Sequence, residues 1–108
     1  MAQHDHRQDE MKAIDRLDRI IHEPARLKIM THLFVVESGD FVYLMRTTGL
    51  TRGNLSSHMT KLEEVGYVEV IKEFVDRKPV TMLRLTEKGR TTFLEYRKNM
   101  ALAIEATH

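Results

Sequence analysis

One amphipathic helix, followed at once by a change of period, constrains the fold of this chain more than any other feature. Residues 51–66 read TRGNLSSHMTKLEEVG. The Thr51 hydroxyl is placed to cap the first turn, and Gly66 suits the left-handed residue that follows a helix. Apolar residues recur at i, i+4 and i+7 and form a stripe along one face: Leu55, Met59 and Leu62. The sequence therefore predicts a helix that packs on one side only.

The opposite face of this helix is small, polar and basic. No Asp or Glu occurs between Thr51 and Leu62, whereas a solvated helix face usually mixes acidic with basic side chains. The candidate contacts are Arg52, Gly53, Asn54, Ser56, Ser57, Thr60 and Lys61. Asn can pair with adenine, and Arg with guanine, through two hydrogen bonds. We predict that this face enters the major groove of DNA; an ordinary solvated surface is the alternative.

Gly53 is unusual among these residues, because glycine in a helix costs about 1 kcal/mol relative to alanine. Its position in the first turn indicates close approach of this helix to another backbone. A structural cause for the glycine is the alternative.

A short helix and a tight turn precede this stretch. Ser38-Gly39-Asp40 has turn chemistry, and Asp40 is placed to cap a helix from Phe41 to about Thr47. Thr48-Gly49-Leu50 then leads directly into Thr51. A short helix, a glycine turn and an amphipathic helix form a helix-turn-helix, here residues 40–65. In that motif the second helix is the one placed in the groove.

After the helix the pattern becomes that of strands. Residues 67–74 and 80–85 are rich in β-branched and aromatic side chains and flank the charged turn VDRKP. They predict a hairpin over residues 67–85, in the position of a wing. Candidate contacts to phosphates or to the minor groove are Arg77 and Lys78 at its tip and Arg46 at the end of the preceding helix. Solvation of the turn is the alternative, and Arg84 can pair with Glu69 or Asp76.

Helices are also predicted at both ends of the chain. Residues 1–8 form a polar, flexible tail, residues 9–21 an amphipathic helix, and Pro24 the first position of the next helix. Thr86 caps a C-terminal helix that reaches Ala106, and this helix is too apolar for a small winged module alone. The two terminal helices therefore predict a dimer interface made of Ile14, Leu17, Ile21, Phe93, Tyr96, Met100 and Ile104.

Composition and charge bound the possibilities. A chain of 108 residues with 42% hydrophobic and 31% charged residues fits one globular domain, residues 9–108, of the α+β class and mainly α. The net charge is only +1, but residues 41–90 hold nine Lys or Arg against six Asp or Glu. No apolar run approaches the ~20 residues of a membrane span, and no signal-peptide pattern is present. We expect a cytoplasmic protein without a membrane partner.

The histidines and the absent cysteines argue against metal and catalytic chemistry. His4 and His6 have the spacing of a metal-binding pair, but a mobile tail is the preferred interpretation. His32 and His58 are expected to pack partly buried, with a phosphate contact as the alternative for His58. The chain has no glycine-rich phosphate loop and no grouped nucleophile and base. We therefore expect no cofactor, no metal and no enzymatic activity.

Several motifs resemble one family. They are EPARLKIM, LTRGNLSSHMTKLEEVGYVEV and LRLTEKGR, and together with their order they make residues 23–100 similar to winged helix-turn-helix transcriptional regulators of the MarR/ArsR type. The Leu-Thr-x-x-Gly step at residues 85–89 is MarR-like, and Ser-x-His-Met at residues 56–59 resembles the ArsR pattern with Met in place of Leu.

The resemblance implies a homodimer that binds specific double-stranded DNA and usually represses transcription. Many ArsR-like proteins sense metals through cysteine, which this chain lacks, and its short length leaves a small-molecule effector open and its identity unknown. A winged-helix module that binds protein or structured RNA is the alternative. It should show apolar or acidic residues on the outer helix face, where none occur.

Overall fold

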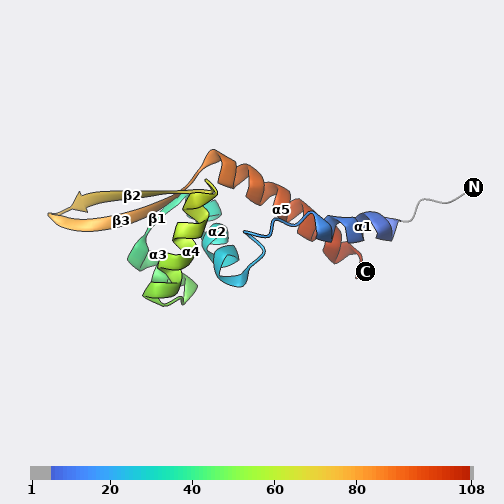
Figure 1. The fold of residues 1–108 in the computed structure, drawn as a ribbon, viewed down its shortest axis with the longest axis horizontal. Helices are drawn as coiled ribbons and strands as arrows, with labels where there is room; N and C mark the ends of the chain where they lie inside the picture. The colour runs from blue at the N-terminus through green and yellow to red at the C-terminus, as the bar shows by residue number, and fades with distance from the viewer. Residues whose placement is uncertain (1–5, 108) are drawn as a thin grey trace, which may run out of the picture.

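The computed structural model describes residues 6–107, which form five helices and a three-stranded antiparallel sheet whose hairpin projects at one end of the molecule (Figure 1). In chain order the elements are α1 (His6–Asp15), α2 (Pro24–Val36), β1 (Ser38–Asp40), α3 (Phe41–Thr48), α4 (Arg52–Glu64), β2 (Val68–Val75), β3 (Lys78–Leu85) and α5 (Glu87–Glu105). The predicted α+β, mainly α, winged helix-turn-helix is confirmed. The molecule is elongated, with extents of 70 × 25 × 21 Å, because α1 and the end of α5 lie far from the hairpin.

The predicted helix caps are present. The hydroxyl of Thr51 accepts a hydrogen bond from the Asn54 amide at 3.2 Å, and the Asp40 carboxylate accepts one from Tyr43 at 2.7 Å. Each satisfies an N–H that the first helical turn leaves unpaired. Gly66 follows α4 with φ +80°, the left-handed conformation that glycine adopts without steric cost. These contacts fix both ends of the helix on which the predicted site depends.

The N-terminal helix differs from the prediction at both ends. It begins at His6, so Arg7 and Gln8 are helical and not part of a tail, and it ends at Asp15 instead of Ile21. The cause is Asp18, whose Oδ1 accepts the backbone N–H groups of residues 20 and 21, both at 2.9 Å. A short acidic side chain thereby offers these amides an alternative to helical bonding. His4 and the start of the predicted tail lie outside the described residues.

The sheet has the order β1-β3-β2. The segment Ser38–Asp40 was predicted as a turn, yet it forms β1 and pairs with β3, with Gly39 opposite Leu83. The hairpin turn is also tighter than the predicted five residues, because Asp76 and Arg77 both adopt positive φ (52° and 66°), as in the turns that suit strand twist. Pro79 is tolerated within β3 because β1 pairs with that strand only at residues 82–84.

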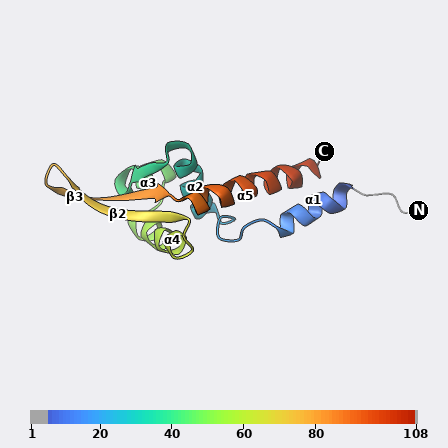
Figure 2. The same cartoon turned by 90° about the horizontal axis from the view of Figure 1, so that it is seen from above.

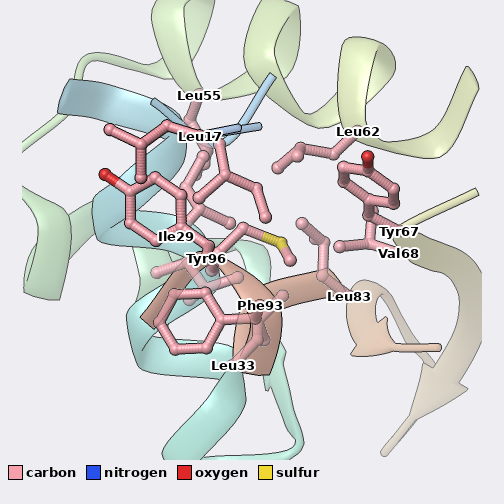
Figure 3. Close-up of a cluster of buried hydrophobic side chains, with 13 residues drawn as sticks. Leu17, Ile29, Leu33, Leu55, Leu62, Tyr67, Val68, Leu83, Phe93 and Tyr96 are labelled. Carbon is pink, nitrogen blue, oxygen red and sulfur yellow. The ribbon is translucent and has the colours of Figure 1, made fainter. Parts of the chain in front are cut away.

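The core lies where α2, α4, α5 and the sheet meet (Figure 3). Leu55 and Leu62 of α4 are fully buried there, so the predicted apolar stripe is confirmed for these two residues, while Met59 is half-buried. Tyr67 packs beside them at the start of the hairpin, and its hydroxyl donates a hydrogen bond to Asp18. This bond ties the loop after α1 to the winged part of the molecule.

Candidate nucleic-acid interface

The outer face of α4 has the exposure that a DNA-reading surface requires. Every residue predicted there is exposed: Arg52, Gly53, Asn54, Ser56, Ser57, Thr60 and Lys61. The opposite face anchors the helix through Leu55 and Leu62. Their contact with DNA stays a prediction, but the fold presents all seven on one surface.

Two of these side chains are pre-positioned by neighbours. The Arg52 guanidinium lies 5.4 Å from the centre of the Phe41 ring, in the geometry of a cation–π contact. The Thr60 hydroxyl donates to the Ser56 carbonyl at 3.0 Å, which leaves its oxygen lone pairs free to accept. Phe41 was not among the predicted site residues. Phe41 lies at the start of α3, in the helix before Arg52, and only the fold shows that the two side chains are in contact.

The hairpin carries the second predicted group of cations. Arg77 lies in the two-residue turn and Lys78 at the start of β3, and both are exposed at the far end of the molecule (Figure 2). Arg84 does not belong to this group, because its guanidinium pairs with the Glu69 carboxylate at 2.7 Å. That pairing is one of the two alternatives that the sequence left open, and it supports the hairpin from its outer face.

A groove joins the helix surface to the hairpin. It has a volume of about 810 Å³ and runs between α3, the first two turns of α4, and the two strands of the hairpin. Three predicted residues line it: Arg46, Arg52 and Ser56. Lys72 of β2 lines it as well, although it was not predicted as a contact. The available signal was the period of two, which places Lys72 on the same strand face as the buried Val68.

His58 and His32 both lie against neighbouring side chains. His58 Nδ1 lies 3.2 Å from the Arg26 guanidinium and 3.7 Å from the Glu23 carboxylate. Burial raises the pKa of Glu23, but hydrogen bonds from the Arg26 and Ala25 amides and the nearby charges outweigh it and hold that pKa below its usual value. His32 is half-buried with its ring 5.7 Å from that of Tyr43. The expected packing role of both histidines therefore agrees with their surroundings.

The predicted dimer set divides into two groups. Leu17, Ile21, Phe93 and Tyr96 are buried within the chain's own core, so these four cannot form an exposed interface. The error arose because a helix stripe shows which side is apolar without showing what covers it. Met100 is half-buried against the core, whereas Ile14 and Ile104 are 46% and 60% exposed. Within residues 6–107 there is no group of three or more potential metal ligands.

Comparison with known proteins agrees with this geometry. Residues 25–104 match the model of the winged helix DNA-binding domain family. The chain belongs to this family. It is also 38% identical over 78 residues to an uncharacterized protein of Methanocaldococcus jannaschii. The matched segment is 72% of this chain and 85% of that protein. Among the described residues, no helix is both long enough and apolar enough to cross a membrane.

Solved structures resemble this one over most of its length. A transcriptional regulator homologue from Pyrococcus horikoshii OT3 superposes with a TM-score of 0.83 at 30% identity, covering 92% of this chain and 97% of that one. A MarR family regulator from Streptomyces coelicolor, solved in complex with DNA, gives a TM-score of 0.61 at 21% identity over 92% and 69% of the two chains. The protein thus has a winged helix DNA-binding domain, and it shares its fold with a MarR family regulator.

Proposed function

We propose that this protein is a transcriptional repressor that binds a specific double-stranded DNA sequence as a homodimer. The observation that carries the proposal is the outer face of α4 from Arg52 to Lys61, which is exposed and has no acidic residue, next to a basic hairpin tip. Asn54 and Arg52 supply base contacts in the major groove, and Arg77 and Lys78 supply backbone or minor-groove contacts. Bound at a promoter, such a dimer blocks transcription, and its DNA partner implies a cytoplasmic location.

The proposed dimer is supported by exposed apolar side chains on α1 and on the end of α5. We use the name arm for α1 and the C-terminal half of α5, residues 96–105, which lie side by side away from the sheet (Figures 1 and 2). Their exposed apolar side chains are Met11, Ile14, Leu102 and Ile104. The radius of gyration is 16.8 Å, against about 13 Å for a compact domain of this size. A second copy packed on the arm would cover these side chains.

Selection of bound sequences from a random duplex library tests the DNA proposal. Binding of the selected site should weaken steeply with salt, because phosphate contacts release counterions. Asn54→Ala should cost about 1–3 kcal/mol at one base position only. Arg77→Ala should weaken all sequences about equally and reduce the salt slope by about one. A library without an enriched sequence, or affinity that is negligible even at low salt, would refute sequence-specific binding.

Sedimentation tests the dimer. Ile14→Glu combined with Ile104→Glu should give monomers, because both substitutions place charge on the exposed side of the arm. Val35→Glu is the matched control, since Val35 is an exposed apolar residue on α2, outside the arm. A dimer mass for the double variant, or a monomer mass for the unaltered protein, would contradict this interface. Repression itself is tested by transcription in vitro from a promoter that contains the selected site.

A cavity beside α2 supports regulation by a small molecule. It has a volume of about 580 Å³ and is lined by His22, Glu23, Pro24, Leu27, Lys28, Thr31, His32 and Thr47. His22 Nδ1 lies 2.8 Å from the Tyr96 hydroxyl on α5, so an occupant of this cavity would touch a residue that holds α5 in place. Benzoate and its neutral analogue benzamide are suitable probes, because the Lys28 ammonium lines the cavity, while the Glu23 carboxylate in the lining is already engaged by the Arg26 amide. Benzoate should raise the melting temperature more than benzamide; equal or absent shifts would refute an anionic effector here.

A further inference from the structure

Lysine and glutamate side chains of β2 lie on opposite faces of the hairpin. Residues opposite each other in an antiparallel pair share a face, and Val70 opposite Leu83 lies on the face of the buried core. Two residues further along, Lys72 opposite Thr81 lies on that same face, and both line the groove beside α4. Glu69 and Glu73 occupy the alternate positions and therefore the outer face. Strand β2 thus turns Lys72 toward the recognition helix and Glu69 and Glu73 away from it.

The groove gathers cations from three elements. Arg46 comes from α3, Arg52 from α4 and Lys72 from β2. The acidic residue in the lining is Asp40, and its carboxylate is engaged by the Tyr43 amide at the start of α3. Among the described residues, neither Arg46 nor Lys72 forms an ion pair. The groove therefore has unneutralised positive charge on opposite walls.

The remaining lining suits the deoxyribose rings that lie between the phosphates of a DNA strand. Phe41, Met59 and Pro79 supply apolar surface, and Ser56 supplies a hydroxyl. Phe74, which is 77% exposed, continues the same hairpin face opposite Pro79, one step beyond Lys72. Alternating anionic phosphates and less polar deoxyribose rings match a groove of this composition.

We propose that this groove holds the sugar–phosphate backbone of one DNA strand, and that Lys72 binds a phosphate between the recognition helix and the hairpin tip. The inference rests on the proposed DNA binding and adds a residue and a path to it. Contacts of this kind set the register of a protein on the duplex without reading bases. Lys72 is accordingly a positioning residue, which fixes the distance between the major-groove contacts of α4 and the contacts of the tip.

A comparison of charge removal on the protein and on the DNA tests this assignment. Lys72→Gln keeps length and polarity but removes the charge, and Arg19→Gln, in the loop after α1 and outside the arm, is the control at another exposed cation. Each protein is titrated against the selected duplex at several salt concentrations. Lys72→Gln should reduce the salt slope by about one and weaken selected and random DNA equally. Arg19→Gln should leave both quantities unchanged.

The phosphate itself is located with duplexes in which one phosphate at a time is replaced by a neutral methylphosphonate. The unaltered protein should bind more weakly when any of several phosphates is replaced. At one of these positions, the replacement should no longer weaken binding of Lys72→Gln. This position should lie between the positions that Asn54→Ala and Arg77→Ala affect. Melting curves confirm that each variant is folded.

The outcomes separate the two proposals. If the unaltered protein and Arg77→Ala behave as proposed but Lys72→Gln keeps the full salt slope and every methylphosphonate effect, the groove assignment is wrong and DNA binding stands. If the unaltered protein binds no duplex, both proposals fall.

Discussion

The lobe formed by α2 to β3 and the arm differ in how completely one chain buries their apolar side chains. In the lobe, Leu44, Leu55, Leu62 and Leu83 are fully buried. In the arm, α1 contacts α5 and its small Ala13 is fully buried, while Met11 and Ile14 of the same helix remain about half exposed. The lobe therefore buries its leucines in the core of a single chain, to which α5 also contributes, whereas the arm leaves an apolar surface for which we propose a second copy.

This difference separates two kinds of stability. Burial inside one chain contributes a free energy of unfolding that does not depend on protein concentration. Burial between two chains contributes only in proportion to association, so it grows with concentration. Variants of the lobe and of the arm should therefore respond differently to dilution.

Leu55→Ala should produce the largest effect. Removing a fully buried leucine from the inner face of α4 costs about 2–5 kcal/mol of unfolding free energy, since the surroundings only partly fill the cavity. Urea unfolding at two protein concentrations measures it. The loss caused by Leu55→Ala should be the same at both concentrations, whereas the smaller loss caused by Ile104→Ala should shrink on dilution. A concentration-independent loss for Ile104→Ala would contradict the comparison.

Gly89→Ala tests the joint between the two regions, with an expected loss of about 3 kcal/mol. A Cβ atom at Gly89 would lie 2.1 Å from the Tyr67 carbonyl oxygen and 2.9 Å from Leu85 Cδ1. The first contact is with backbone, so α5 must shift where it leaves the sheet. Thermal unfolding of Gly89→Ala and of Thr91→Ala, at an exposed position of the same helix, gives the comparison. Equal melting temperatures for these two variants would show that α5 moves without cost.

The sequence predicted the lobe better than the arm, and the reason is local. In the lobe, Thr51, Asp40 and Gly66 act within a few residues of the helix ends that they define, so spacing alone reveals them. The end of α1 depends on Asp18, which bonds to two nearby amides and also to the distant Tyr67 hydroxyl. No periodic pattern reports a partner so far along the chain.

The candidate site shows the same limit. Outward residues of α4 follow from the helical period, which is why all seven predicted residues are exposed. Lys72 was missed because its role depends on the strand register and on the place of the hairpin above α3 and α4. Leu17 and Phe93 were assigned to the wrong surface for the complementary reason: their apolar character was clear, but the elements that cover them come from other parts of the chain.

Tyr67→Phe tests the bond between the lobe and the loop that follows α1. Losing the hydrogen bond to Asp18 should cost about 1 kcal/mol at pH 8. Burial, together with that bond, raises the pKa of Tyr67 to about 12. The folded state therefore favours the neutral phenol, and this contribution is complete below pH 10 and is lost as the pH rises toward 12.

Urea unfolding at pH 8 and at pH 12 measures both effects. The stability difference between the unaltered protein and Tyr67→Phe should shrink over this interval, while the pKa of Tyr96, which burial also raises, affects both proteins alike. A difference that stays constant up to pH 12 would mean that the Tyr67 hydroxyl contributes nothing through its protonation.

Gly53→Ala should have the smallest effect on folding and the opposite sign. A Cβ atom at Gly53 meets nothing within 4 Å, so alanine should stabilise α4 by about 0.5 kcal/mol through its higher helix propensity. No contact within the described chain explains the glycine, which leaves close approach of DNA as the reason that we propose. The variant should therefore melt at a slightly higher temperature and bind the selected duplex more weakly. If Gly53→Ala binds as tightly as the unaltered protein, the methyl group is accommodated at the DNA surface, and the start of α4 does not approach the backbone closely. A higher melting temperature together with weaker DNA binding would show that Gly53 serves DNA contact and not folding.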